Sequence, residues 1–163
     1  MRTIYLILFF LFNLGVAQAA ELKVGDPAPD FKALDDQGKT VSLKDFSGKA
    51  VVLYFYPKDD TPGCTREAQN FRDHHSEFQS LDTVVLGVSG DSLESHRAFK
   101  QKHQLPFSLL VDKDHKIAKA YGVAITLFPS RDVIMIDAQG KIMKILRNVN
   151  PQTVVGVLLQ DAK

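Results

Sequence analysis

The stretch from Tyr54 to Glu67 reads YFYPKDDTPGCTRE and joins a strand directly to a helix. The residues from Ala50 to Tyr56 form an unbroken apolar and aromatic run, which predicts a central strand buried on both faces, and Pro57 ends it. Thr61 follows as a helix N-cap, with Pro62 at the first helical position. A buried strand that passes into a helix within a few residues predicts an α/β protein.

The segments on either side continue the alternation of strands and helices. Turns of the type Asp-x-Gln-Gly-Lys predict two hairpins, and apolar runs between amphipathic segments predict further strands. The expected elements are a hairpin of 31–34 and 40–43, a helix from 62 to 81, a strand at 83–89, a helix at 92–103, a strand at 107–111, a short helix at 114–121, a hairpin of 133–136 and 141–146, and a last helix that opens at Pro151 and carries Val154, Val155, Leu158 and Leu159 on one face. This order predicts a thioredoxin-like fold, with a mixed central sheet flanked by helices and an N-terminal β-hairpin extension.

Length and composition indicate one globular domain behind a targeting segment. The 163 residues are 45% apolar and 24% charged, a balance that excludes a disordered or fibrous chain. Arg2, the apolar run from Ile4 to Leu14 and the end Ala17-Gln18-Ala19 follow the pattern of a secretory signal peptide. A membrane anchor or a buried strand is the alternative, but the run is shorter than the ~20 residues of a span. We expect a signal peptide at 1–19, cut after Ala19, and an exported domain at 20–163, periplasmic or secreted.

The chain without this segment is electrically balanced. Arg2 is the only charged residue before residue 20, so 19 basic and 19 acidic side chains remain. That balance gives no indication of binding to nucleic acid or to an anionic membrane. We therefore expect no nucleic-acid partner and no stable membrane insertion after the signal peptide is removed.

The sequence holds a single cysteine, Cys64. Small exported proteins that use cysteine structurally carry an even number, because these cysteines pair. One cysteine cannot form an internal disulfide. Cys64 is therefore an inert buried thiol, a partner in an intermolecular bond or a reactive nucleophile.

The position of Cys64 favours the nucleophile. It lies in the expected first turn of the helix, where unpaired backbone N–H groups and the positive end of the helix dipole stabilise a thiolate. The alternative is that Thr61 only caps the helix, Pro62 only starts it and Cys64 only packs beneath the sheet. That alternative does not account for an unpaired thiol at Thr-Pro-Gly-Cys spacing, where disulfide oxidoreductases have Cys-x-x-Cys.

The same stretch resembles the peroxiredoxins. Pro57, Thr61 and Cys64 match the family signature Pro-x-x-x-Thr-x-x-Cys. Tyr-Phe-Tyr-Pro followed by Thr-Pro-Gly-Cys-Thr looks like the Q type, also called the bacterioferritin-comigratory-protein group, of the AhpC/TSA family. The similarity runs from about Val24 to the C-terminus and takes in Arg131.

The resemblance implies a thiol-dependent peroxidase that needs no cofactor. Cys64 would be the peroxidatic cysteine, whose thiolate attacks hydrogen peroxide or a small organic hydroperoxide and becomes a sulfenic acid. Thr61 would orient the peroxide through its hydroxyl, and Pro57 would shield the sulfenate from water. Arg131 would add positive charge beside the thiolate and the transition state. Glu67, one turn beyond Cys64, would orient an arginine.

One position departs from the commonest Q-type pattern. Many members keep a resolving cysteine five residues after the peroxidatic one, where this chain has Gln69. We therefore expect a one-cysteine cycle, in which an external thiol reduces the sulfenic acid through a mixed disulfide, with over-oxidation as the risk. The expected partners are the peroxide and a thiol reductant, which is a thioredoxin-like protein, a glutaredoxin or glutathione. The resemblance to the Q type, whose members are often monomers, implies a monomer or weak dimer.

The histidines give no metal-binding pattern. His74 and His75 are adjacent and point to different helix faces, and three more histidines lack ligand spacing. These three are His96, His103 and His115. We therefore expect no metal site.

Asp59 and Asp60 are expected to be solvated loop charges, with tuning of access to Cys64 as the alternative. Two other functions stay open beside the peroxidase. An exported disulfide exchanger would share the fold, but the missing second cysteine disfavours it. A redox sensor or binding module would use Cys64 only as a modifiable thiol.

Overall fold

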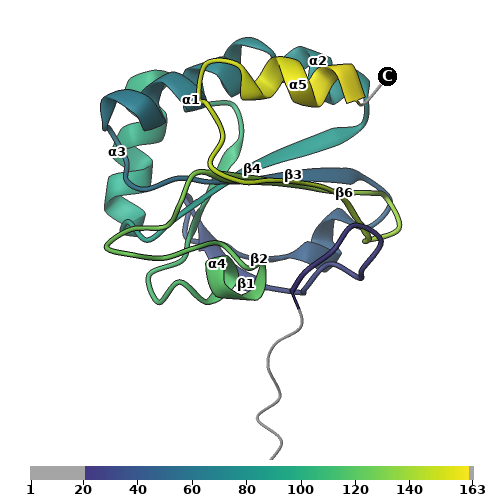
Figure 1. Ribbon diagram of the computed structural model, residues 1–163. Coiled ribbons are helices and arrows are strands. Elements are labelled where there is room, and N and C mark those ends of the chain that lie inside the picture. The colour runs from purple at the N-terminus through teal and green to yellow at the C-terminus, as the bar shows by residue number, and fades with distance from the viewer. Residues whose placement is uncertain (1–20, 162–163) are drawn as a thin grey trace, which may run out of the picture.

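The computed structural model describes residues 21–161, which form one seven-stranded mixed sheet with helices on both faces (Figure 1). The predicted signal peptide at 1–19 lies outside the described residues. In chain order the elements are β1 (Lys32–Asp35), β2 (Thr40–Ser42), the 3-10 helix η1 (Leu43–Phe46), β3 (Ala50–Phe55), α1 (Pro62–Asp73), α2 (His75–Ser80), β4 (Thr83–Ser89), α3 (Leu93–His103), β5 (Ser108–Val111), α4 (Lys116–Ala120), β6 (Asp132–Ile136), β7 (Ile142–Leu146) and α5 (Val154–Asp161). The predicted mixed α/β architecture is confirmed.

The sheet has the strand order β2-β1-β5-β4-β3-β6-β7. β3 pairs parallel with β4 and antiparallel with β6, and β4 pairs parallel with β5. The two predicted hairpins, β1 with β2 and β6 with β7, form the two edges. Because β3 has neighbours on both sides and helices above and below, it carries the continuous apolar run that the sequence shows.

Alternate side chains of β3 enter two separate cores. Val52 and Tyr54 pack with residues from α1, α2, α3 and α5 on one face of the sheet. Val51, Leu53 and Phe55 pack on the other face with α4, η1 and the N-terminal hairpin. The first of these cores also buries the four apolar residues predicted for one face of the last helix, which are Val154, Val155, Leu158 and Leu159.

Two predicted helix boundaries are wrong. The helix expected from 62 to 81 is interrupted at His74, where φ is −105° and ψ is 12°. The His74 ring Nδ1 lies 2.9 Å from the Asn70 carbonyl oxygen, so the side chain binds a carbonyl of the last helical turn. The last helix begins at Val154 rather than Pro151, because the Asn150 side chain accepts the Gln152 N–H and holds a turn there.

Among residues 21–161, the longest helices are too short and too polar to serve as a membrane span.

Candidate active site

Cys64 lies in the first turn of α1, as predicted, at the carboxyl end of the central strand β3. Thr61 is the N-cap residue and Pro62 the first helical residue, and the Thr65 N–H donates to the Thr61 carbonyl at 2.8 Å. The Cys64 side chain is 1% exposed and belongs to the core between the sheet and the helices α1, α3 and α5. A helix start of this kind directs unpaired N–H groups toward the region of the thiol.

Arg131 contacts this thiol. Its Nη2 lies 3.4 Å from Cys64 Sγ, although the two residues are 67 positions apart in the chain. The sheet explains the contact, because Asp132 at the start of β6 pairs with Phe55 at the end of β3. Gly63 leaves room for the guanidinium, since a Cβ there would lie 3.1 Å from Nη2.

Glu67 holds the other side of the same guanidinium. Its buried Oε2 accepts a hydrogen bond from Arg131 Nη1, which confirms the expected contact of Glu67 with an arginine. Burial raises the pKa of Glu67 to about 7, against the opposing effect of Arg131. Burial disfavours the charge of Arg131, but Glu67 and Cys64 together raise its pKa above the ordinary arginine value. The guanidinium is therefore a fixed positive charge beside the sulfur.

Thr61 and Pro57 lie in the loop that leads from β3 into α1, and both are half-buried. The Thr61 hydroxyl donates to the Lys58 carbonyl at 3.1 Å. In the described part of the chain it makes no capping bond to an N–H of α1. The loop thus fixes the hydroxyl through its own backbone, one helical turn before Cys64.

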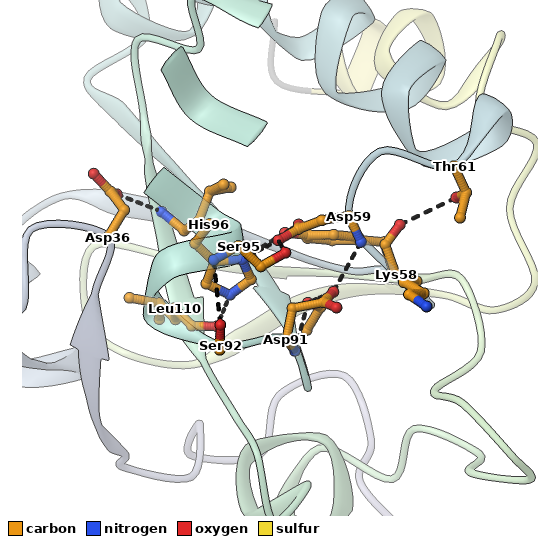
Figure 2. Close-up of polar contacts among 12 residues, drawn as sticks. Asp36, Lys58, Asp59, Thr61, Asp91, Ser92, Ser95, His96 and Leu110 are labelled. Atoms are coloured by element: carbon orange, nitrogen blue, oxygen red, sulfur yellow. Dashed lines mark hydrogen bonds and ion pairs between the residues drawn. The ribbon is translucent and has the colours of Figure 1, made fainter. Parts of the chain in front are cut away.

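The expectation of two solvated aspartates is wrong for Asp59. Asp60 is exposed and pairs with Lys102 and His103, whereas Asp59 is 6% exposed. Figure 2 shows the Asp59 side chain among polar residues of other elements, including His96 of α3. The sequence contains no local signal for this burial, because His96 lies 37 positions along the chain.

The position of the resolving cysteine in many relatives is occupied by Gln69, a half-buried residue of α1. Its Nε2 lies 3.5 Å from His103 Nδ1. A groove of about 460 Å³ runs beside the first turn of α1 and is lined by Pro62, Gly63 and Arg66 together with Asn148, Asn150, Pro151 and Gln152.

Across residues 21–161, no three histidine, cysteine, aspartate or glutamate side chains are grouped so that they could hold a metal ion. The chemistry that the described site offers is that of one thiol with a fixed cation. A helix N-terminus and a guanidinium both stabilise a thiolate, which is the nucleophilic form of cysteine.

Comparison with known proteins gives a consistent set of relatives. The model of the AhpC/TSA family matches residues 24–145. The chain is similar to peroxiredoxin Bcp of Bacillus subtilis, with 46% identity over 150 residues that cover 87% of this chain and 96% of the relative. It is similar to the chloroplastic peroxiredoxin Q of Sedum lineare, with 44% identity over 132 residues that cover 79% of this chain and 71% of the relative.

The solved structure of the bacterioferritin comigratory protein of Xanthomonas campestris is similar in three dimensions. It superposes with a TM-score of 0.81 and 28% identity, covering 86% of this chain and 95% of that one. The predicted thioredoxin-like fold is confirmed by this similarity to a peroxiredoxin structure.

Proposed function

The chain belongs to the AhpC/TSA family and is a peroxiredoxin, an enzyme of the thiol peroxidase class, and on that premise we propose that Cys64 reduces peroxides through a sulfenic acid that an external thiol then resolves. The observation that carries this proposal is the contact of Arg131 Nη2 with Cys64 Sγ, at 3.4 Å in the first turn of α1. A cation held by Glu67 at this distance stabilises the thiolate and the charge that develops on the peroxide oxygens.

The first step forms a sulfur–oxygen bond. The Cys64 thiolate attacks one peroxide oxygen, the O–O bond breaks, and the sulfur gives up two electrons. The leaving hydroxide or alkoxide takes up a proton from the solvent, equivalent to the one that the thiol released on ionisation, and departs as water or an alcohol. Thr61 is proposed to orient the peroxide, and Pro57 to shield the sulfenate from water.

The second step requires a thiol from another molecule, because Cys64 is the only cysteine of the sequence. The external thiol attacks the Cys64 sulfenic acid, a mixed disulfide forms and water leaves. A second thiol group then attacks the sulfur of the reductant, which releases the Cys64 thiolate and an external disulfide. A thioredoxin-like protein, a glutaredoxin or glutathione has the chemistry for this role, acting on a monomer or weak dimer.

Hydrogen peroxide and small organic hydroperoxides are the proposed substrates. The X. campestris bacterioferritin comigratory protein is described for an alkyl peroxide reduction activity, which supports the organic part of this range.

The test compares the mature protein with Cys64→Ser in peroxide consumption with dithiothreitol. We expect the substitution to abolish consumption, and we expect dimedone to label Cys64 after one addition of peroxide. Equal rates for the two proteins would leave only a sensor or binding module. Ser76→Ala, an exposed position of α2, is the control for handling and should keep the full rate.

Export is a separate proposal, supported by the pattern of residues 1–19. We propose that the chain is cut after Ala19 and acts in the periplasm or outside the cell. N-terminal sequencing of the protein from the exported fraction should begin at Ala20. An intact Met1 would contradict this proposal and leave the peroxidase proposal untouched.

A further inference from the structure

The loop between β3 and α1 contains a buried acid that the reaction proposed above does not use. Asp59 lies between two exposed residues, Lys58 and Asp60, yet its own side chain is 3% exposed. It stands five positions before Cys64. Burial of a carboxylate is strongly unfavourable unless the group is paired and hydrogen-bonded.

Both carboxylate oxygens and the backbone N–H of Asp59 have hydrogen-bond partners (Figure 2). Its Oδ1 accepts from the Tyr56 hydroxyl at 2.7 Å, and its Oδ2 accepts from Ser95 Oγ at 2.8 Å. Oδ2 also lies 2.8 Å from His96 Nδ1. The Asp59 backbone N–H donates to Asp91 Oδ2 at 2.8 Å.

The contacts of His96 determine where its protons are. His96 is fully buried, and its Nε2 lies 3.2 Å from the Leu110 carbonyl oxygen, which can only accept. Nε2 therefore carries a hydrogen, and Nδ1 shares a second proton with Asp59. Tyr56 and Ser95 both donate to the Asp59 carboxyl group as well, so the carboxyl group and the imidazole form one hydrogen-bonded unit.

This pair ties the loop to three other elements. Ser95 and His96 belong to α3, and Leu110 belongs to β5. Asp91 follows β4 and is itself held by Ser89 Oγ at 2.7 Å. The side chain and the backbone of Asp59 are thus fixed at the same time, by parts of the protein that are far away in the chain.

The residues on either side of Asp59 connect it to the active site. The Lys58 carbonyl, directly before Asp59, accepts the Thr61 hydroxyl at 3.1 Å. Thr61 is the N-cap of α1, and Cys64 follows in the first turn. A change at Asp59 therefore moves both the threonine hydroxyl and the helix start that carries the thiol.

We propose that Asp59 and His96 are positioning residues of the peroxidase reaction, which hold the loop from Pro57 to Thr61 so that Thr61 and Cys64 engage the peroxide together. This inference rests on the proposed function. In this proposal the pair does not touch the reacting atoms. A general role in stability would make both contacts of His96 equally important, whereas a positioning role makes its contact with Asp59 matter more for the rate than its contact with Leu110.

Two substitutions of His96 separate these contacts. His96→Asn places an amide nitrogen where Nδ1 lies, so it keeps a donor to Asp59 and loses the bond to Leu110. His96→Gln reaches the Leu110 carbonyl and loses the donor to Asp59. Both replace the imidazole by a buried amide in the same core.

The measurement is kcat/KM for hydrogen peroxide, with dithiothreitol as reductant. We expect H96N to stay within about threefold of the wild type, and H96Q to fall by at least about tenfold, because small displacements of reacting groups lower rates strongly. Thermal unfolding of both variants is the check on stability. Equal losses in both variants, no loss in either, or a larger loss in H96N would each overturn the inference.

A second set of variants covers the case in which H96Q does not fold. Tyr56→Phe and Ser95→Ala each remove one donor to Asp59, and each is expected to lower kcat/KM by about threefold. Ser76→Ala is the control, because Ser76 is exposed in α2 and lies outside this loop, and it should stay at the wild-type rate. Wild-type rates in Y56F and S95A would overturn the inference.

Failure of the proposed peroxidase function would give a different experimental result from failure of the positioning inference. If the wild type consumes no more peroxide than Cys64→Ser, the peroxidase proposal fails for all variants alike. The rate of Cys64 alkylation by iodoacetamide then tests the positioning alone. H96Q should differ from the wild type by at least about threefold and H96N should not, while equal rates in all three would overturn it.

Discussion

At the scale of single residues, the Arg131 guanidinium contacts both Glu67 and Cys64. This arrangement predicts how a substitution of Arg131 affects the reaction rate. Arg131→Lys keeps a positive charge, but an ammonium cannot contact Glu67 and Cys64 at once as the planar guanidinium does. We expect kcat/KM for peroxide to fall by about 10²-fold, the size seen when one preorganised donor is removed. Stopped-flow measurement of Cys64 oxidation tests this, with Arg66→Lys, an exposed arginine of α1, as the control. Equal rates for the two variants would contradict the role.

Glu67 gives the protein a pH-dependent stability. Because burial raises its pKa to about 7, the folded protein keeps a proton that the unfolded chain releases near pH 4.5. The contribution of this group to the free energy of unfolding therefore declines as the pH rises from about 4.5 to about 7, by as much as about 3 kcal/mol.

Denaturant unfolding of the wild type and of Glu67→Gln across this pH range tests the prediction. The glutamine cannot titrate, so the variant should gain stability relative to the wild type as the pH rises. Parallel curves for the two proteins would show that Glu67 keeps an ordinary pKa in the fold.

The sequence predicted single residues well only where their partners are close in the chain. Cys64 was found from its place behind Thr61 and Pro62, which are local signals for a helix start. Asp59 was misjudged because His96, which makes its burial possible, comes from α3 and meets it only in the folded sheet. Arg131 was proposed by resemblance alone, since its contact with Cys64 depends on the pairing of β6 with β3.

At the scale of elements, Gly87 of β4 is tightly packed against Tyr54 of β3 and Leu109 of β5. A Cβ at this position would lie 2.6 Å from the Tyr54 hydroxyl and 2.7 Å from Leu109 Cδ2. Gly87→Ala should therefore destabilise the fold by about 1–3 kcal/mol. Gly156→Ala in α5 is the matched control, because the described residues leave the space at its Cβ open, and it should stabilise by about 0.5–1 kcal/mol. Thermal unfolding measures both, and an unchanged G87A would contradict the packing.

Helix ends were the least predictable elements. Phe71 of α1 and Phe78 of α2 are both buried, so one apolar face continues across the range 62–81 although the helix is broken within it. The interruption at His74 was missed because it depends on the ring of that residue and the Asn70 carbonyl, a contact without an apolar pattern. Periodicity reports which face is buried and gives little information on where a helix stops.

At the scale of the whole molecule, a chain with one cysteine has a fixed stoichiometry. Without a thiol reductant, one equivalent of peroxide should oxidise each molecule once and no turnover should follow, because the sulfenic acid has no internal thiol partner and only slow over-oxidation can consume more. Mass spectrometry should find a single added oxygen at Cys64, and excess peroxide should convert it to the sulfinic acid. Continued consumption without any thiol would contradict the one-cysteine cycle.

The burial of this lone cysteine also has a consequence for biosynthesis. A chain with one cysteine has no disulfide to form and none to mispair, so its maturation needs neither an oxidant nor an isomerase, and the slow reshuffling of disulfides does not limit it. The newly made polypeptide exposes the thiol until the helices have packed onto the sheet and buried it. Because folding reduces the exposure of Cys64 to 1%, we expect the thiol to be oxidised most readily before the fold has formed.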